Sequence, residues 1–407
     1  MTAASQIETT FREEHGRVMA ALISQFGDFT LAEDALQDAL VNALERWNVD
    51  GVPRNPGAWL VTVAKRRAID RIRHSRFEEH DPAILESLSQ EEPEMNVSFP
   101  DDRLKLMFTC CHPALALEAQ VGLTLHTLGG LSTSEVARAF LVSEPTMAQR
   151  LARARRKIRE AGIPYRVPPA DLLPERLDAL LAVIYLIFNE GYVSTRGDTL
   201  IRHELCHEAI RLCRILVDLM PESAEAHGLL ALMLLHDSRR LARLTSTGDL
   251  VLLEEQDRTL WDSAEIREGI AVLDEAITLR DPGPYQVQAA ISALHAQAPT
   301  AAETDWTQIA MLYDTLVRMT PSMVVEVNRA VAVSMAIGPQ QGLQMLLQLE
   351  NDADHFYPYH AARADLLRRT NQREAAADAY QRALELCGNP AERAYLQRRL
   401  DELVDPK

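Results

Sequence analysis

The chain has 407 residues, a formal net charge of −17, an apolar fraction of 47% and only 17 glycines. This length is enough for two or three domains with cores of their own, and the acidic balance excludes a protein that coats nucleic acid indiscriminately. The five cysteines are too few and too scattered for a disulfide framework, which predicts reduced thiols in a cytoplasmic protein.

Neither the N-terminus nor any later stretch predicts a membrane segment. The first residues are polar and lack the apolar core of a signal peptide. No run of about 18 apolar residues occurs that would span a bilayer. Glycine is sparse and helical spacing recurs over long stretches, so the sequence predicts an all-α fold.

Two helices are expected first, over residues 7–27 and 28–47. The second has acids in its first half, which the helix dipole alone would favour. Its apolar positions form a single stripe at helical spacing: Leu36, Leu40, Ala43 and Leu44.

The segment 53–76 is the main basic island of the N-terminal half. It contains seven Lys and Arg residues and a single acid, Asp70. From Trp59 onward the spacing predicts a helix with an apolar arc opposite an arginine face, a layout that suits a polyanion with exposed bases. The alternatives are a solvated basic helix and, for Trp59, a core anchor.

The segment 77–102 differs sharply from its neighbours. It contains nine acidic residues, no Lys or Arg, and several prolines, with little periodic apolar signal. This composition predicts a linker between two small helical domains.

A helix-turn-helix is predicted after the linker. Ser132 and Glu135 fit a capping box that opens a helix over 133–140. A turn follows at 141–143, and a second helix begins near Pro145, a residue tolerated in a first turn.

The second helix of this motif is strongly amphipathic. Its apolar stripe consists of Met147, Leu151, Ala154 and Ile158. The opposite arc consists of Thr146, Gln149, Arg150, Arg153, Arg156 and Lys157. This layout is typical of a recognition helix that packs on its partner and reaches bases and phosphates in a major groove. A plain surface helix is the alternative.

Three segments resemble, in order and spacing, the two-domain body of bacterial extracytoplasmic-function sigma factors: LAEDALQDALVNALERW, PRNPGAWLVTVAKRRAIDRIR and GGLSTSEVARAFLVSEPTMAQRLARARRKIRE. These proteins are the promoter-specificity subunits of RNA polymerase. The resemblance covers about residues 7–162. It implies a region 2-like domain at 1–76, the linker at 77–102 and a region 4-like domain at 103–165.

The resemblance also implies roles for individual residues. In the family, the helix matching 28–47 docks on core polymerase, which implies contacts for Glu33, Asp34, Gln37, Asp38 and Asn42. The segment matching 51–76 recognises and opens the −10 element, which implies contacts for Arg54, Asn55, Trp59, Lys65, Arg66, Arg67, Arg71, Arg73 and Arg76. The recognition helix would read the −35 element through Thr146, Gln149, Arg150, Arg153, Arg156 and Lys157.

The chain departs from the family pattern at Arg66. Many members have asparagine there, within Ala-Arg-Asn-x-x-x-Asp. We therefore expect the base-specific contacts at this position to differ from those of the family, and the attraction to phosphate to be stronger.

The C-terminal half, 166–407, carries degenerate repeats. Their spacing resembles the end of a tetratricopeptide repeat at Ala209, Cys213, Leu216 and Pro221, again at Ile309, Tyr313, Leu316 and Pro321, and more loosely at Ala364, Ala376, Tyr380 and Ala383. Such helix pairs stack into surfaces that hold a peptide or partner protein. The whole chain resembles sigma factors with such an extension, which is thought to govern their activity in place of a membrane anti-sigma factor.

Two short patterns suggest metal sites. His203 to His207 matches H-E-x-x-H, in which two histidines bind zinc and the glutamate acts as a base. The pattern also arises by chance, and a surface pair of histidines is the alternative. In Cys110-Cys111-His112 the adjacent cysteines cannot easily ligate one ion, so small core residues or a redox-sensitive thiol are the options. We expect no metal and no cofactor.

The sequence thus predicts a sigma factor with a regulatory helical extension, which is not itself an enzyme. Its expected partners are core RNA polymerase, promoter DNA and a protein or peptide held by the extension, with no membrane. One alternative is a stand-alone helix-turn-helix regulator with a TPR-like sensor, which would need neither the 28–47 helix nor the 53–76 segment. A remote alternative is an H-E-x-x-H zinc hydrolase.

Overall fold

A computed structural model describes residues 3–77, 100–140, 142–193, 199–245, 250–388 and 390–404. Across these ranges the secondary structure is helical, and the single β-pairing is an isolated bridge between Leu244 and Leu250. The predicted all-α fold is therefore confirmed. The helices form two units: residues 1–190 with 200–219, and residues 191–199 with 220–407.

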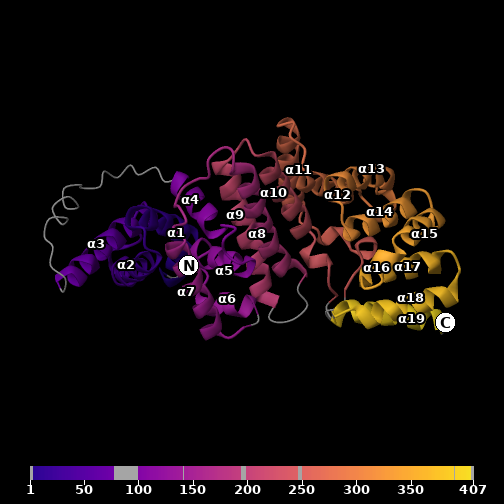
Figure 1. Ribbon diagram of the computed structural model, residues 1–407, viewed down its shortest axis with the longest axis horizontal. Helices are drawn as coiled ribbons and strands as arrows, with labels where there is room; N and C mark the ends of the chain where they lie inside the picture. The colour runs from indigo at the N-terminus through magenta and orange to yellow at the C-terminus, as the bar shows by residue number, and fades with distance from the viewer. Residues whose placement is uncertain are drawn as a thin grey trace. The chain divides into compact units, whose positions relative to one another are not determined.

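The first unit begins with three helices, α1 (Ala3–Phe26), α2 (Phe29–Asp50) and α3 (Pro56–Phe77) (Figure 1). Gly27 ends α1 with a φ of 68°, a conformation that glycine adopts without a steric penalty. The carboxylate of Asp28 then accepts hydrogen bonds from the backbone nitrogens of Thr30 and Leu31, at 2.8 and 3.1 Å. This cap satisfies free N–H groups at the start of α2.

The predicted helix-turn-helix is present. It follows α4 (Pro100–Cys110) and α5 (Leu117–Thr127), and consists of α6 (Thr133–Ala139) and α7 (Glu144–Glu160). Ser132 and Glu135 form the expected capping box, in which each side chain bonds the other residue's backbone nitrogen. The predicted linker falls largely on residues 78–99, which lie outside the described ranges, and its last residues belong to α4.

Two helices beyond residue 165 complete the first unit. These are α8 (Leu173–Val193) and α9 (Thr199–Leu219), of which residues 173–190 and 200–219 belong to it. Arg176 of α8 donates to the carbonyl of Phe108 at 2.5 Å, and Arg211 of α9 donates to the carbonyl of Leu128 at 3.1 Å. These bonds link α8 and α9 to the ends of α4 and α5, and therefore to the helix-turn-helix domain.

The second unit is a succession of short antiparallel helices (Figure 1). In chain order it contains α10 (Ala224–Asp237), η1 (Arg240–Ala242), η2 (Leu253–Glu255), η3 (Arg258–Leu260), α11 (Ser263–Thr278), α12 (Pro284–Gln297), η4 (Ala301–Glu303), α13 (Trp306–Met319), α14 (Met323–Ala336), α15 (Pro339–Gln348), α16 (Glu350–Ala353), α17 (Tyr357–Arg369), α18 (Arg373–Leu386) and α19 (Pro390–Val404). Repeat positions Ala364, Ala376, Tyr380 and Ala383 are buried in one core cluster. In the described part of the chain, no helix has both the length and the hydropathy to cross a membrane.

Candidate nucleic-acid interface

Helix α7 presents a polar, basic face to solvent. The apolar stripe predicted for it is confirmed: Met147, Leu151, Ala154 and Ile158 are each at most 7% exposed. On the opposite side the exposed residues are Thr146, Gln149, Arg153, Arg156 and Lys157, while Arg150 is half-buried. One strip of the helix thus packs inward and leaves a row of donors free to approach a polyanion.

The start of α7 is fixed by local hydrogen bonds. The side chain of Ser143 accepts from the backbone nitrogen of Thr146 at 3.4 Å, and the two hydroxyl groups lie 2.8 Å apart. Pro145 occupies the first turn, as predicted. The position of Thr146 is therefore set by the cap before any ligand binds.

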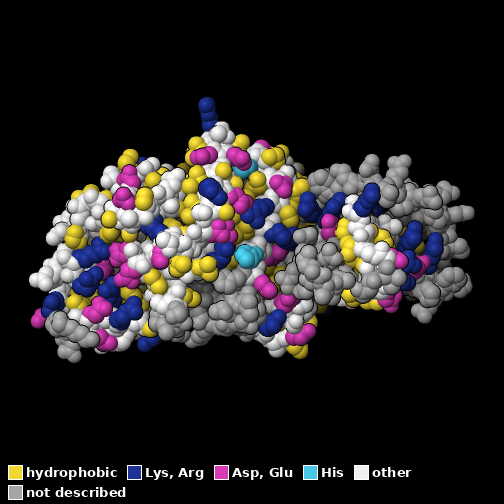
Figure 2. Space-filling model, turned by 180° about the vertical axis from the view of Figure 1, so that it is seen from behind, with side chains coloured by type: hydrophobic (Ala, Val, Ile, Leu, Met, Phe, Trp, Pro, Cys, Tyr) yellow, Lys and Arg dark blue, Asp and Glu magenta, His cyan; other side chains and the backbone are white. Residues whose placement is uncertain are grey.

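The DNA contacts predicted for α3 and the loop before it differ in exposure. Arg54 and Asn55 of the loop and Arg66 and Arg67 of α3 are exposed. Lys65 and Arg73 are half-buried, and the side chain of Arg76 lies outside the described residues. The right end of Figure 2, where α3 lies, shows Lys and Arg side chains gathered beside Asp and Glu side chains. The basic island predicted for α3 is thus mixed with carboxylates.

Arg71 of α3 forms ion pairs with α2. Its guanidinium nitrogens lie 2.5 Å from an oxygen of Asp34 and 2.9 Å from an oxygen of Asp38, both on α2. A predicted DNA contact and two predicted polymerase contacts are therefore brought together as an ion-pair cluster. The cluster is about 40% exposed, so its charges remain within reach of solvent and of a partner.

Trp59 lies half-buried in the first turn of α3. Its ring meets Trp47 of α2 edge-on, with 5.3 Å between the ring centroids and 62° between the planes. Trp47 is only 4% exposed. Trp59 therefore packs on a buried aromatic side chain and keeps part of its own ring accessible to solvent.

Asn55 has a structural task at the entry to α3. Its side-chain oxygen accepts a hydrogen bond from the backbone nitrogen of Ala58 at 3.0 Å. This is the geometry of an N-cap, so the amide oxygen of Asn55 stabilises the start of α3.

The outer face of α2 combines polar and apolar residues. Gln37 is exposed, and Val41 and Leu44 are 58% and 46% exposed. Of the apolar positions at helical spacing, Leu36 and Ala43 are buried at 2% and 0%, whereas Leu44 lies on the exposed side of the helix. Helical spacing alone does not predict the exposure of Leu44, because a leucine at the edge of an apolar stripe fits either face of the helix.

Glu33 of α2 faces the helix-turn-helix domain. It forms an ion pair with Arg155 of α7, and its carboxylate lies 3.3 Å from the ring of His126 on α5. Glu33 and Arg155 are both only 18% exposed. Sequence reasoning missed Arg155, which lies between the buried and exposed arcs of α7 and whose partner is 122 residues away.

A cavity of about 670 Å³ lies beside this ion pair, between the α1–α2 turn and the end of α7. Tyr165 lines it, and its hydroxyl is 3.0 Å from the carbonyl oxygen of Ala20 and 3.1 Å from that of Asp102. Burial and the nearby Asp102 carboxylate raise the pKa of Tyr165, so its hydroxyl stays a neutral donor. Tyr165 thus ties α1 to the start of α4.

The two metal patterns lie on α9 and at the C-terminal end of α4. Glu204 and His207 are exposed on α9, and the side chain of His203 lies outside the described residues. Among the side chains that the structure places, no group of three His, Cys, Asp or Glu residues is arranged to hold a metal ion.

Cys110 and Cys111 are fully buried. Burial raises the pKa of both thiols, that of Cys111 to about 12, so both are protonated at neutral pH. The Cys111 sulfur lies 3.5 Å from the Thr124 hydroxyl. A buried, protonated thiol is a weak nucleophile, which favours the interpretation of these cysteines as core residues.

Comparison with known families identifies three parts of the chain. Residues 10–78 match the family model described as Sigma-70 region 2, and residues 105–158 match Sigma-70, region 4. Residues 176–277 match a family of unknown function, DUF6596.

Relatives match either nearly the whole chain or a part of it. An uncharacterized protein of Rhizobium meliloti (strain 1021) is 42% identical over 99% of this chain and 97% of its own length. The ECF RNA polymerase sigma factor SigL of Mycobacterium tuberculosis is 30% identical over 36% of this chain and 84% of its own length. The probable ECF RNA polymerase sigma factor SigI of the same species is 27% identical over 42% of this chain, which spans 60% of SigI.

Proposed function

The chain belongs to the extracytoplasmic-function family of RNA polymerase sigma factors, and we propose that it binds core polymerase through α2 and reads promoters through α3 and α7. In this proposal α7 reads the −35 element and the α3 segment recognises and opens the −10 element. The C-terminal unit modulates this activity.

The observation that carries the proposal is the division of α7 into two arcs. Its apolar residues are buried and its predicted base-reading residues, with the exception of Arg150, are exposed. Arginine, glutamine and threonine side chains are suited to base edges and phosphates in a major groove. A helix presented in this way after a capped partner helix is the docking geometry of a helix-turn-helix.

The outer face of α2 supports polymerase binding. Val41 and Leu44 expose apolar surface beside Gln37 on one side of the helix. Apolar residues with a polar rim are the usual anatomy of a protein interface. The alternative of a stand-alone DNA-binding regulator offers no partner for this face.

The −10 proposal rests on the entry to α3. Exposed Arg54 and Asn55 precede Trp59. The ring of Trp59 is partly accessible and packs edge-on against the ring of Trp47. A supported aromatic beside cations suits single-stranded bases, which stack on aromatic faces while the backbone meets positive charge.

The decisive experiment is run-off transcription with purified bacterial core polymerase and the full chain. We expect promoter-specific transcripts on templates taken from genomic sites that the protein enriches. The variant Val41→Glu should abolish core binding and transcription because it places a charge in the proposed interface. The matched control is Ile337→Glu, which places the same charge at a 74% exposed residue directly after α14.

Tight binding to duplex DNA with no transcript and no complex with core polymerase would overturn the proposal. That result would establish the stand-alone regulator instead. Equal loss of transcription in the Val41 and Ile337 variants would remove α2 as the docking face.

A further inference from the structure

Residues 250–258 of the second unit, which we call the strap, form no α-helix. The strap runs through η2 to the start of η3 along one face of the helical array. Its first part is held by a hydrogen bond from the backbone nitrogen of Val251 to the carbonyl of Arg243 at 2.9 Å. At its far end Arg258 donates to the carbonyl of Ala298 at 2.8 Å. The strap is therefore anchored at both ends.

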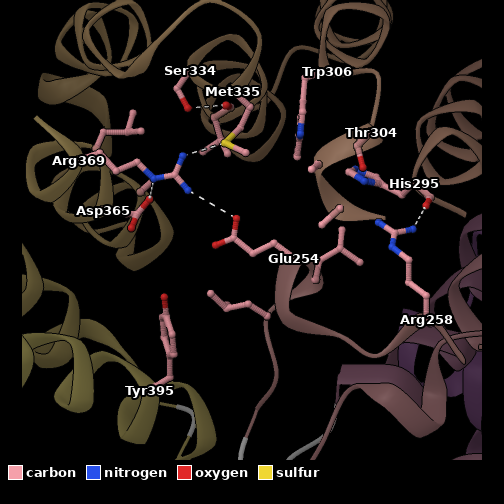
Figure 3. A pocket seen from close by; sticks show the side chains of 17 residues that line it. Glu254, Arg258, His295, Thr304, Trp306, Ser334, Met335, Asp365, Arg369 and Tyr395 are labelled. Carbon is pink, nitrogen blue, oxygen red and sulfur yellow. Dashed lines mark hydrogen bonds and ion pairs between the residues drawn. The ribbon is translucent and has the colours of Figure 1, made fainter. Parts of the chain in front are cut away.

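The middle of the strap is held by two ion pairs to distant helices. Glu254 lies 3.6 Å from Arg369 of α17, and Glu255 lies 3.3 Å from Arg399 of α19. Figure 3 shows Glu254 reaching across the cavity toward Arg369. Two adjacent carboxylates thus meet two arginines that the fold brings to one face.

Both arginines are held in place by residues near them on their own helices. The Arg369 guanidinium lies 2.8 Å from Asp365. Arg399 is held by Glu402 at 3.1 Å and by the hydroxyl of Tyr395, also at 3.1 Å. Because these contacts restrict the guanidinium groups in advance, a carboxylate that binds them costs less conformational entropy.

The strap fits the apolar part of this face poorly. A cavity of about 430 Å³ separates it from the array. Its apolar lining includes Leu252, Leu253, Trp306, Val331, Met335 and Leu366. Both leucines are only half-buried, and the side-chain oxygen of Gln256 is buried without a hydrogen-bond partner in the structure. Unfilled apolar space forfeits packing contacts, and an unpaired buried acceptor also costs free energy.

We propose that this face of the second unit is a binding groove for a segment of another protein in which large apolar residues precede two adjacent acidic residues. The strap occupies the groove in cis and resembles that ligand in charge, but it leaves the apolar cavity unfilled. The proposal goes beyond polymerase and promoter binding, and it is tested without either of them.

Displacement of the strap is energetically reasonable. Glu254 and Glu255 are 44% and 47% exposed, and ion pairs at such exposure contribute little to stability. A competing segment regains both pairs and fills the cavity as well. The strap in turn acts as a tethered competitor, which raises the ligand concentration required for binding.

The test is fluorescence anisotropy with labelled synthetic peptides and the full chain. The reference peptide copies residues 250–258, LVLLEEQDR. A second peptide replaces the leucine that corresponds to Leu253 by phenylalanine, and a third replaces both glutamates by glutamine. We expect the phenylalanine peptide to bind more tightly than the reference, because it fills the cavity, and the glutamine peptide to bind more weakly.

Protein variants separate competition from recognition. In the chain, Glu254→Gln with Glu255→Gln weakens the strap and should raise affinity for the reference peptide about fivefold for each ion pair removed. Arg399→Gln should reduce peptide binding in this background. The matched control, Glu374→Gln with Asp378→Asn, removes the same charge from exposed positions of α18 and should change nothing. Thermal unfolding checks that every variant is folded.

Three results would overturn the proposal. The first is that no peptide binds the strap variant. The second is that all three peptides bind it equally, which would exclude recognition of carboxylates. The third is that the apolar dye ANS binds the strap variant while no peptide displaces it, which would show an apolar pocket for small molecules instead.

Discussion

Helices α3 and α7 are both basic and amphipathic, but they differ in how their Lys and Arg side chains are paired. On α7 most of the predicted polar arc is exposed, including Arg153 and Lys157. On α3, Arg71 is paired with Asp34 and Asp38. Helical spacing predicts which face of a helix is exposed. The acidic residues of a neighbouring helix decide which Lys and Arg side chains on that face form ion pairs.

Arg155 shows the same rule within α7 itself. It borders the exposed arc, but its guanidinium turns to Glu33 of α2. The neighbouring Arg156 is more than half exposed, and its ion-pair partner, Glu160 at 3.8 Å, is on the same helix. Two adjacent arginines therefore differ because only one of them lies opposite an acid of another helix.

The largest expected effect comes from the buried arc of α7. Leu151 is 3% exposed, so Leu151→Ala should destabilise the first unit by about 2–5 kcal/mol through lost burial and the cavity left behind. Chemical denaturation measures this change. Arg153→Ala is the matched control on the exposed arc and should shift stability by less than about 0.5 kcal/mol. Similar losses in the two variants would contradict the two-arc description.

The exposed arc is tested by promoter binding. Arg153→Ala should weaken promoter complexes by about 1–3 kcal/mol if Arg153 contacts a base, and mainly on templates with an intact −35 element. Run-off transcription and DNA binding on intact and −35-mutant promoters measure this difference. Equal losses on both templates would show that Arg153 acts through stability or through non-specific charge.

The pH dependence of the free energy of unfolding tests the burial of His15 of α1 within the first unit. Burial, with the charges of His126 and Arg211, lowers the pKa of His15 from 6.5 to about 3. Between these values the unfolded chain binds a proton that the folded chain does not, so stability falls as the pH is lowered through this window. The expected slope is about 1.4 kcal/mol per pH unit.

The control for this prediction is His15→Leu, which removes the titrating group and keeps an apolar side chain. Denaturation of the first unit between pH 6.5 and 4 should show a smaller slope in this variant. An unchanged slope would assign the acid sensitivity to other groups.

The smallest expected effect concerns the paired cation of α3. Arg71→Ala removes two partly exposed ion pairs, so the free energy of unfolding should fall by no more than about 1 kcal/mol. A double-mutant cycle with Asp38→Ala should give a coupling energy of the same order, which decreases as salt is added. Zero coupling at low salt would mean that Arg71 is free to contact DNA like the exposed cations of α7.

The sequence alone determined the local features of this protein. The capping box of Ser132 and Glu135, the buried stripe of α7 and the break at Gly27 were all predictable, because caps, helical periodicity and glycine conformation depend on residues within a few turns of one another. The sigma-factor body was likewise predictable, because its motifs are short and follow in a set order.

The tertiary structure alone decided what depends on distant partners. The ion pair of Glu33 with Arg155, the exposure of Leu44 and the meeting of the strap with Arg399 join or separate residues far apart in the chain. No periodicity encodes such pairs, because each requires two helices to be placed side by side by a core formed elsewhere. Helical spacing thus predicted the buried and exposed arcs of α7, whereas the packing of distant helices decided which charged side chains are paired.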